Sequence, residues 1–274
     1  MTVPGTGVSS IQVVQPATRG DSMGLTIEDL GFRSIEDKVI LLTGASSGIG
    51  RSTALLLAKA GCRLALMARR KDRLESLAAA IGEFTDTEPL LITGDVRNED
   101  ECNAAVHSCL EAFGSIDVLI NNAGVGVVSD LSMATTEEYK NVMETNVDGV
   151  FFMTRAVLPV LKESGRGDIV MISSPAGERA NPVAPIYCMS KFALEAYTAG
   201  LRLQLNQLHD QGIHIRVIDV LPGATDSEYW GIREVPREKF MTAGEMAAVV
   251  VQTIAASPEV LVKKIEVEQF RFQG

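Results

Sequence analysis

The sequence predicts an α/β fold, in which a single doubly wound (Rossmann-type) domain holds a seven-stranded parallel sheet flanked by helices. Three observations support this class. From Lys38 onward, short apolar runs alternate with segments of helical periodicity, and such alternation produces right-handed crossovers and a parallel sheet covered on both faces. A glycine-rich turn follows the first apolar run. The chain has 274 residues, a length that suits one large α/β domain.

Seven apolar runs are the predicted strands, because each is short and ends at a turn residue or at the start of a helical segment. They are residues 39–42, 64–67, 90–92, 118–120, 169–172, 213–220 and 261–267. The predicted helices are residues 49–60, 74–81, 98–113, 135–163, 186–209 and 242–256. Three helices begin with a capping residue followed three positions later by glutamate, at Asn98 and Glu101, Thr135 and Glu138, and Thr242 and Glu245.

Residues 1–34 differ from the rest of the chain. They are rich in Gly, Ser, Thr, Pro and Val and show neither helical nor strand periodicity. We therefore expect a flexible N-terminal tail over residues 1–34. The nucleotide-binding domain, including the substrate site, is expected over residues 35–274. Met23 offers an alternative start, and we expect removal of residues 2–22 to leave the stability of the domain nearly unchanged.

Composition and charge narrow the functional class. The formal net charge is −10, and a globally acidic surface argues against nucleic-acid binding, which needs basic groups to neutralise phosphates. The four cysteines form no CxxC pair and the three histidines do not cluster, so no metal site is expected. No signal peptide and no membrane-spanning run is visible. We expect a cytoplasmic protein with reduced thiols and no nucleic-acid or membrane partner.

The turn after the first predicted strand has the composition of a phosphate-binding turn. It reads Thr-Gly-Ala-Ser-Ser-Gly-Ile-Gly over residues 43–50. Glycines let the backbone approach a pyrophosphate, and the following helix presents free N–H groups to it. An ordinary glycine-rich turn is the simpler alternative, but three glycines directly after an apolar strand argue against it. The candidate cofactor-binding residues here are Gly44, Ser46, Ser47, Gly48, Ile49 and Gly50.

Further short motifs occur at the ends of predicted strands and on one helix. The motifs after strands are Asp95-Val96, Asn121-Asn122-Ala123-Gly124 and Pro222-Gly223-Ala224-Thr225. On the helix, Tyr187 and Lys191 form a YxxxK pair, and a spacing of four residues places both side chains on one face. Each motif alone is weak, because the first three also occur in ordinary turns and YxxxK arises by chance in many helices.

Taken in order, and with the glycine spacing TGxxxGxG, these motifs resemble those of the classical short-chain dehydrogenase/reductase family. The resemblance extends from Lys38 to Val267. It implies an NAD(P)-dependent oxidoreductase and assigns cofactor contacts beyond the glycine turn. These contacts are Asp95 and Val96 at the adenine ring, Asn122, Ala123 and Gly124 along the cleft, and Pro222, Gly223 and Thr225 near the nicotinamide.

The resemblance also implies a catalytic set of Asn146, Ser174, Tyr187 and Lys191. A free tyrosine has a pKa of about 10 and a nearby ammonium lowers it. Lys191 is therefore expected to tune Tyr187, the proton donor to a carbonyl oxygen, and by resemblance to hold the nicotinamide ribose. Ser174 is expected to hydrogen-bond the substrate oxygen, with Ser173 as the neighbouring alternative. Asn146 is expected to hold a water that links the lysine to solvent, while the cofactor carries the hydride.

The end of the second predicted strand favours NADP(H). Members of the family that prefer NAD place an acidic residue there to bind the ribose hydroxyls, but this chain has Ala68 followed by Arg69. An arginine suits a 2′-phosphate, although a solvated basic turn is the alternative. Ser47 departs from the pattern, because many NADP-preferring members carry a basic residue there. NADP(H) is favoured, and NAD(H) is left open.

The expected substrate is a small or medium alcohol/carbonyl pair, because the segment between Gly223 and the last predicted helix is too short for a large lid. Its pocket should involve Val125, Val127, residues 175–181 and Tyr229 with Trp230. The helical segments 149–163 and 186–209 resemble the family's subunit-packing helices. We therefore expect a homodimer or homotetramer.

Two other functions share some of these features. An extended-branch epimerase or dehydratase also carries YxxxK, but its glycine turn differs and it needs a larger C-terminal substrate domain. A non-catalytic dinucleotide-binding sensor would need only the cofactor half of the site. The presence of all four residues of the catalytic set argues against a sensor.

Overall fold

The structure confirms the predicted fold class. It is a computed structural model that describes residues 32–127, 130–230 and 234–270. Seven strands form one sheet in the order β3-β2-β1-β4-β5-β6-β9, and every neighbouring pair is parallel. The order changes direction between β1 and β4, so the loops after these two strands diverge. Ligands of doubly wound sheets bind at such a switch point.

The strands are mostly buried, as expected for a sheet between two layers of helices. They are β1 (Val39–Thr43), β2 (Arg63–Ala68), β3 (Leu90–Thr93), β4 (Val118–Asn121), β5 (Arg166–Ile172), β6 (His214–Pro222) and β9 (Lys264–Val267). All seven predicted strands are present, and the last begins three positions later than predicted. The sequence did not predict a separate two-stranded ladder of β7 (Thr225–Asp226) and β8 (Met241–Thr242).

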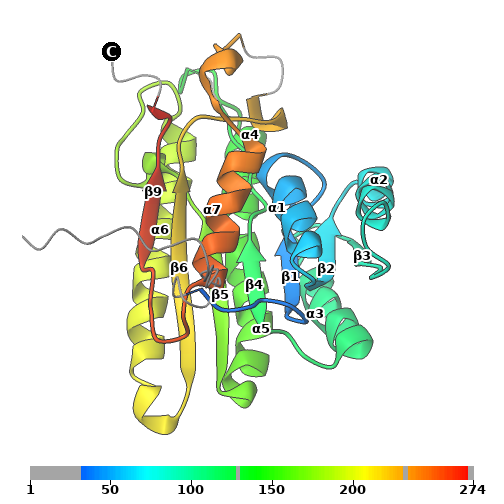
Figure 1. Ribbon diagram of the computed structural model, residues 1–274. Helices are drawn as coiled ribbons and strands as arrows, with labels where there is room; N and C mark the ends of the chain where they lie inside the picture. Colours follow the sequence, from blue (N-terminus) through cyan, green and yellow to red (C-terminus); the bar gives the residue numbers. More distant parts are fainter. Residues whose placement is uncertain (1–31, 128–129, 231–233, 271–274) are drawn as a thin grey trace, which may run out of the picture.

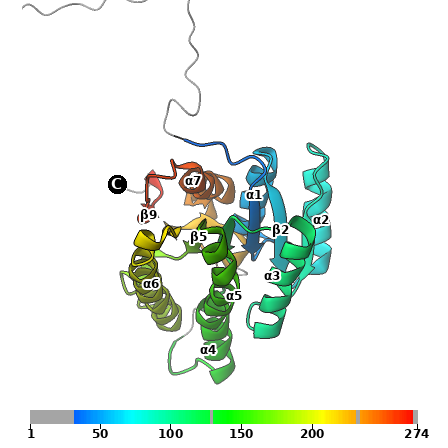
Figure 2. The ribbon, with the colours of Figure 1, turned by 90° about the horizontal axis from the view of Figure 1, so that it is seen from below.

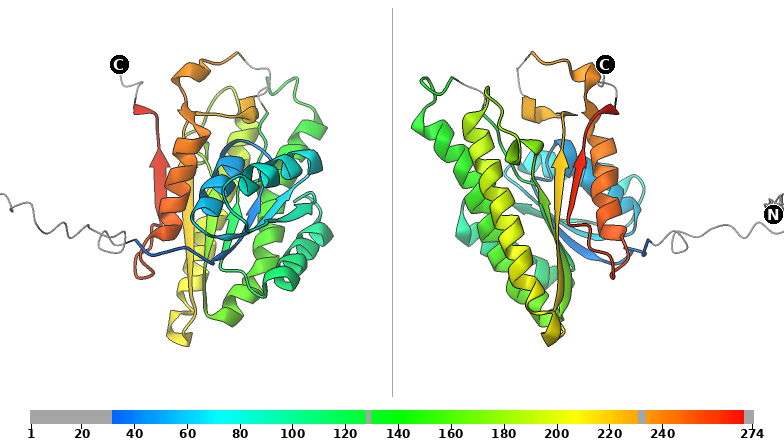
Figure 3. Two further views of the ribbon diagram at one scale, coloured as in Figure 1. Left: turned by 45° about the vertical axis from the view of Figure 1, so that its right-hand side comes forward. Right: turned by 90° about the vertical axis from the view of Figure 1, so that its left-hand side faces the viewer.

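Helices cover the two faces of the sheet in separate layers (Figures 1 and 2). One layer shares a core with the sheet and contains α1 (Gly48–Lys59), α2 (Lys71–Gly82) and α7 (Ala243–Ala255). The other contains α3 (Glu99–Phe113), α5 (Gly149–Ser164) and α6 (Pro185–Asn206). Figure 3 shows β6 and β9 side by side, with α6 and α7 on opposite faces. Within the described ranges, no helix is both long and apolar enough to cross a bilayer.

The helix predicted over residues 135–163 is interrupted. It begins as α4 (Thr136–Met143), passes through a π-helical turn at Glu144–Asp148 and continues as α5. A π turn inserts an extra residue into a helix and often marks a functional site. Here it contains Asn146, one of the predicted catalytic residues. All three predicted N-caps are present, with side-chain oxygens accepting backbone N–H groups.

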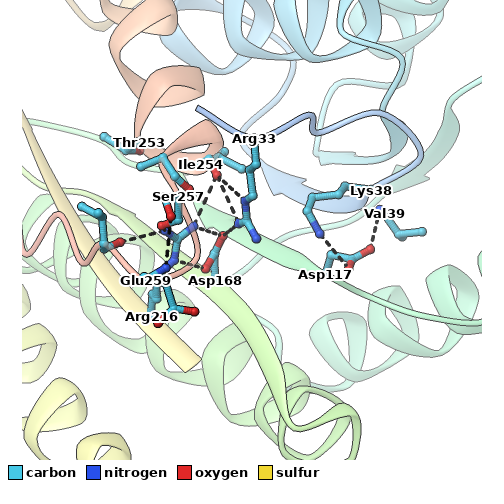
Figure 4. A network of polar contacts seen from close by, with 12 residues as sticks. Arg33, Lys38, Val39, Asp117, Asp168, Arg216, Thr253, Ile254, Ser257 and Glu259 are labelled. Carbon is cyan, nitrogen blue, oxygen red and sulfur yellow. Dashed lines mark hydrogen bonds and ion pairs between the residues drawn. The ribbon is translucent and has the colours of Figure 1, made fainter. Parts of the chain in front are cut away.

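An ion-pair cluster at the amino ends of the strands fixes the beginning of the described chain (Figure 4). The carboxylate of Asp168 on β5 is 3% exposed and accepts bonds of 2.7 Å from the guanidinium groups of Arg33 and Arg216. Both arginines also donate to the carbonyl of Ile254 near the end of α7. Arg33 belongs to the predicted tail, so the tail's last residues contact the domain. Residues 1–31 lie outside the described part of the chain.

Candidate active site

A cleft of about 1080 Å³ opens at the carboxyl ends of the central strands, the edge at which parallel α/β sheets bind ligands. Its walls come from the segments that follow β1, β2, β3, β4, β5 and β6 and from the first turns of α6. The predicted cofactor and catalytic residues therefore come from six segments that follow strands, from α6 and, for Asn146, from the π turn. The fold brings nearly all of them to this one cleft.

The turn between β1 and α1 requires its glycines. Gly44 and Gly48 have φ angles of +67° and +54°, a region that residues with a Cβ atom rarely adopt. A Cβ atom on Gly50 would lie 2.4 Å from the side-chain nitrogen of Asn122. The side chain of Ser47 does not cap α1, and the first turn of α1 carries no acidic residue. The positive end of this helix is therefore suited to an anion.

The Asn122–Gly124 segment after β4 holds the glycine turn in position. The side-chain nitrogen of Asn122 donates to the carbonyls of Thr43 and Gly44 at 2.9 and 3.1 Å. The hydroxyl of Thr43 accepts the backbone N–H groups of Asn122 and Ala123, both at 3.1 Å. The two loops therefore form one rigid wall at the switch point. Asn122, Ala123 and Gly124 all line the cleft, whereas Gly50 lies behind the turn.

Tyr187 and Lys191 lie on the first turns of α6 and line the cleft. The ammonium of Lys191 is 5.7 Å from the ring centre of Tyr187 and donates a 2.9 Å hydrogen bond to the carbonyl of Ile172. Lys191 is 5% exposed. Burial lowers the pKa of Lys191 from 10.5 to about 8, and the charge of Asp219 partly opposes this. The ammonium is therefore the main form at neutral pH, but it loses its proton more readily than a surface lysine does.

Ser173 and Ser174 follow β5, and both line the cleft. The hydroxyl oxygen of Ser174 accepts the N–H of Ala176 at 3.1 Å, which leaves the hydroxyl proton for a ligand. Ser173 is 4% exposed, and its hydroxyl has no hydrogen-bond partner among the described residues. Ser174 is the more accessible of the two, and Ser173 is still an alternative on geometry alone.

The side chain of Asn146 does not enter the cleft. Its amide oxygen accepts the N–H of Val125 at 2.9 Å, and its amide nitrogen donates to the carbonyl of Val125 and to the hydroxyl of Ser190. Ser190 in turn donates to the backbone carbonyl of Tyr187 at 2.7 Å. The side chain of Asn146 therefore joins the loop after β4 to the helix of the Tyr–Lys pair. Asn146 was predicted to hold a water. In the structure both its amide oxygen and its amide nitrogen are hydrogen-bonded to protein groups.

Two arginines that follow β2, Arg69 and Arg70, also line the cleft. Arg70 donates to the hydroxyls of Ser46 and Ser47 at 2.9 and 2.7 Å. The guanidinium of Arg69 lies 3.9 Å from the carboxylate of Asp95. The sequence predicted Arg69 as the phosphate-binding residue and did not predict Arg70. The directions of two adjacent side chains after a strand depend on the conformation of the following turn, which the sequence did not reveal.

Asp95 also lines the cleft, together with Val96. Partial burial opposes ionisation of Asp95, but hydrogen bonds from Arg97 and the charges of Arg97 and Arg69 hold the pKa of this carboxyl below its usual value. The contact with Arg97, which donates to Asp95 from both its backbone and its guanidinium, was not predicted. Asp95 is therefore a fixed anion that orients two arginines.

The segment after β6 forms the wall next to the C-terminal strand. Pro222, Gly223 and Thr225 line the cleft. Gly223 donates its N–H to the carbonyl of Val267 at 2.7 Å, and a Cβ atom at this position would lie 2.8 Å from the same oxygen. The hydroxyl of Thr225 donates to the carbonyl of Gly223 at 3.0 Å. The predicted Pro-Gly turn is thus pressed against the end of β9.

The expected substrate wall is present in part. Val125, Pro175, Ala176, residues 179–181 and Trp230 line the cleft. Val127 does not, and the side chain of Tyr229 lies outside the described residues. Glu178 also points elsewhere and pairs with Lys264 on β9. Glu268 and Gln269, which the sequence did not implicate, complete this wall, and Glu268 pairs with Arg179 across the opening at 2.7 Å.

A doubly wound sheet with a glycine turn and a Tyr–Lys helix on one cleft defines a nucleotide-binding oxidoreductase of the Rossmann type. The chain belongs to the short-chain dehydrogenase family, because residues 38–234 match the family model described as short chain dehydrogenase. An NADP-dependent 3-hydroxy acid dehydrogenase of Schizosaccharomyces pombe is 35% identical to it over 201 residues, which are 73% of this chain and 76% of that protein.

Solved structures share the fold over almost their whole length. An alcohol dehydrogenase from the archaeon Thermococcus sibiricus, complexed with 5-hydroxy-NADP, has a TM-score of 0.78 and 29% identity, and the match covers 87% of this chain and 99% of that one. A 3-ketoacyl-(acyl-carrier-protein) reductase from Brucella melitensis, complexed with NADH, has the same TM-score and coverage with 28% identity. Structures with each type of nicotinamide cofactor are thus among the neighbours.

Proposed function

We propose that the protein is an NADP(H)-dependent dehydrogenase or reductase that acts on a small or medium alcohol/carbonyl substrate. The observation that carries this proposal is the position of Lys191, which is buried against the Tyr187 ring at the inner wall of the cleft. Burial of an ammonium costs free energy. A buried lysine with a shifted pKa that lines a cleft is therefore typical of a functional site.

The residues around the Tyr–Lys pair would each act on the substrate oxygen or on its proton donor. A bound dinucleotide supplies or accepts the hydride. Lys191 stabilises the phenolate form of Tyr187, so that the phenol can give its proton to a carbonyl oxygen or take one from an alcohol. Ser174 donates a hydrogen bond to the same oxygen. Asn146 acts on the substrate site only indirectly, because its hydrogen bonds hold Val125 and the helix that carries Tyr187 in position.

The residues at the other end of the cleft fit a dinucleotide with a 2′-phosphate. The residue at the end of β2 is not acidic but Ala68, which is 7% exposed. Asp95 and Glu228 also line this end of the cleft, and they pair with the two arginines there. Arg70 lies on the hydroxyls of Ser46 and Ser47 and supplies the basic group that the glycine turn itself lacks at Ser47. With Arg69 beside it, the site offers two guanidinium groups, the group best shaped for phosphate.

The substrate proposal rests on the chemistry of the cleft wall. Val125, Pro175, Ala176 and Trp230 supply apolar surface beside the predicted catalytic serine and tyrosine. Arg179 and Glu268 form an ion pair at the same opening, so the outer part of the wall is polar. A compact carbonyl compound with one apolar side suits this combination.

A panel of small alcohols and ketones, read by the absorbance of the reduced nicotinamide, tests the proposal. We expect turnover of at least one compound, faster with NADPH or NADP⁺ than with the NAD forms. Tyr187→Phe is the matched control and should bind the cofactor without turnover. Cofactor binding with no turnover of any compound would favour a non-catalytic sensor. A preference for NADH would overturn only the cofactor assignment.

We also propose that the chain assembles into a homodimer or homotetramer. Large apolar side chains on α4, α5 and α6 are 41–44% exposed, namely Tyr139, Phe151, Met189 and Phe192. Such a group of exposed apolar side chains is typical of an interface. Light scattering coupled to size-exclusion chromatography should give a multiple of the chain mass, and Phe151→Glu with Phe192→Glu should reduce it. A monomer in the unmodified protein would contradict the proposal.

A further inference from the structure

A second pair of ionisable side chains, on α6 and β6, lies outside the cleft lining. Asp219 on β6 is fully buried, with 0% exposure. Glu195 lies one helical turn after Lys191 on α6, and its carboxyl group is within hydrogen-bonding reach of the carboxyl of Asp219. A strand residue and a helix residue thus place two acids together, and one of them, Asp219, acts on the charge of Lys191.

The two carboxyl groups have too few donors for both to be ionised. No N–H or O–H group of the described residues donates to either side-chain oxygen of Asp219, or to Oε2 of Glu195. A buried carboxylate without a donor is strongly unfavourable. Two facing carboxyl groups avoid this cost by sharing one proton, because the protonated group then donates to the ionised one.

The surrounding charges decide which acid keeps the proton. Lys264 on β9 forms an ion pair with Glu195 and a second one with Glu178. Burial opposes ionisation of Glu195, but its hydrogen bonds with Asp219 and Lys264 hold its pKa below the usual value. Burial, reinforced by Glu195, raises the pKa of Asp219 from 3.8 to about 8. Near neutrality the negative charge therefore lies on Glu195 and the proton on Asp219.

Asp219 is also the acid that acts on Lys191. Burial lowers the pKa of Lys191, and a negative charge on Asp219 raises it. The other charged groups facing the pair are Arg202 on α6, Lys264 on β9 and Glu178 before α6. Burial and Asp219 are the two influences on the pKa of Lys191, so the shared charge stabilises the ammonium when it lies on Asp219 and not when it lies on Glu195.

We propose that Asp219 and Glu195 share one proton, and that the location of their negative charge sets how firmly Lys191 holds its own proton. Both acids are positioning residues that act through Lys191. As the pH rises, the shared proton leaves to solvent by way of Glu195, whose side chain is 23% exposed. The link to catalysis rests on the function proposed above for Lys191, whereas the shared proton does not.

The shared proton can be tested in the full-length protein without cofactor or substrate. With ¹³C-carboxyl-labelled aspartate, NMR should show one aspartate that titrates above neutrality. That signal should be missing in Asp219→Asn and should titrate at lower pH in Glu195→Gln, because the neighbouring charge is gone. An Asp219 signal that titrates in the ordinary acidic range would overturn the shared proton.

The coupling to Lys191 predicts opposite effects from two isosteric changes. Glu195→Gln places the single negative charge on Asp219 and should raise the pKa of Lys191. Asp219→Asn removes the charge that Asp219 gains when its own proton leaves above neutrality, and should lower the pKa of Lys191. With ¹³Cε-labelled lysine we expect shifts of about one pH unit in opposite directions. Shifts in the same direction, or none, would indicate a structural disturbance and overturn the coupling. Glu195 is partly exposed, so Glu195→Gln alone decides the matter if Asp219→Asn does not fold.

Glu178→Gln is the matched control, because Glu178 shares Lys264 with Glu195 but does not contact Asp219. It should leave both titrations in place. Once a substrate is known, the alkaline limb of the pH–turnover profile should move with the pKa of Lys191 in each variant. If the pKa of Lys191 shifts in a variant but the alkaline limb of its pH–turnover profile does not, the link to catalysis is wrong. Absence of all turnover would refute the proposed function, while the NMR titrations would still decide on the shared proton.

Discussion

The ammonium of Lys191 lies 5.7 Å from the ring centre of Tyr187 and is hydrogen-bonded to the carbonyl of Ile172. Because the lysine is buried, its charge acts on the tyrosine with little screening by water. The same burial makes the lysine easier to deprotonate. The arrangement of Tyr187 and Lys191 should therefore affect both the turnover of the enzyme and the pH dependence of its free energy of unfolding, and each can be measured.

Tyr187→Phe tests the effect on turnover. The change removes the acidic hydroxyl but keeps the ring, so the fold and the affinity for NADPH should survive. Turnover should fall by about two or more orders of magnitude, the scale of general acid–base catalysis. Steady-state kinetics and cofactor titration on the same preparation provide the measurement. A folded variant with nearly normal turnover would refute the assignment of Tyr187.

Lys191→Met tests the effect on the free energy of unfolding without cofactor. Because the pKa of Lys191 is lowered from 10.5 to about 8 in the folded protein, the unfolded chain binds more protons between those values. The free energy of unfolding of the unmodified protein should therefore rise by about 2–3 kcal/mol relative to the variant across this window. Urea denaturation at pH 7.5 and near pH 10 measures it. A difference that does not change with pH would contradict a lowered pKa.

Arg69→Ala tests the choice of cofactor. Loss of one charge-assisted phosphate contact should cost about 1.5–3 kcal/mol, or roughly ten- to a hundredfold in NADPH affinity, and leave NADH nearly unaffected. Arg70→Ala should weaken NADPH at least as much, because Arg70 also braces Ser46 and Ser47. Arg73→Ala is the control, since Arg73 does not line the cleft. Equal losses for both cofactors would show that Arg69 is structural.

The Asp168 cluster predicts which part of the N-terminal segment matters for stability. Deletion of residues 2–22 should leave the melting temperature nearly unchanged. Arg216→Ala should destabilise by about 3–5 kcal/mol, because it takes the bidentate partner from a buried carboxylate. Arg33→Ala should cost less, since Arg216 still holds Asp168. A large loss on deletion of residues 2–22 would place the tail within the fold or a subunit contact.

The sequence predicted the sheet and the cleft residues because both depend on local signals. Apolar runs located all seven strands, and the glycine turn required the backbone angles found at Gly44 and Gly48. The π turn around Asn146 was missed because the side-chain periodicity on its two sides is that of one continuous helix. Such an insertion is decided by packing against neighbouring elements.

Contacts between distant elements were also beyond sequence reasoning. Asp219 and Glu195 lie on different elements, and only the docking of α6 on β6 brings their carboxyl groups together. Arg70 could not be distinguished from Arg69 before the turn after β2 was known. Arg33 was assigned to the flexible tail because of the composition of residues 1–34, but it forms an ion pair with the buried Asp168 on β5. In each case the interaction depends on tertiary packing, which no periodicity records.

The proximity of β9 to the Pro-Gly turn has a practical consequence for handling the protein. Gly223 is hydrogen-bonded to Val267, and Glu268 and Gln269 line the cleft. An affinity tag or fluorescent label attached close to Gln269 would lie beside the substrate opening. A label close to Arg33 would instead lie at the amino ends of the strands, because Arg33 bonds to Asp168 near the start of β5. Conversely, an environment-sensitive dye attached near Gln269 would give an optical readout of ligand entry.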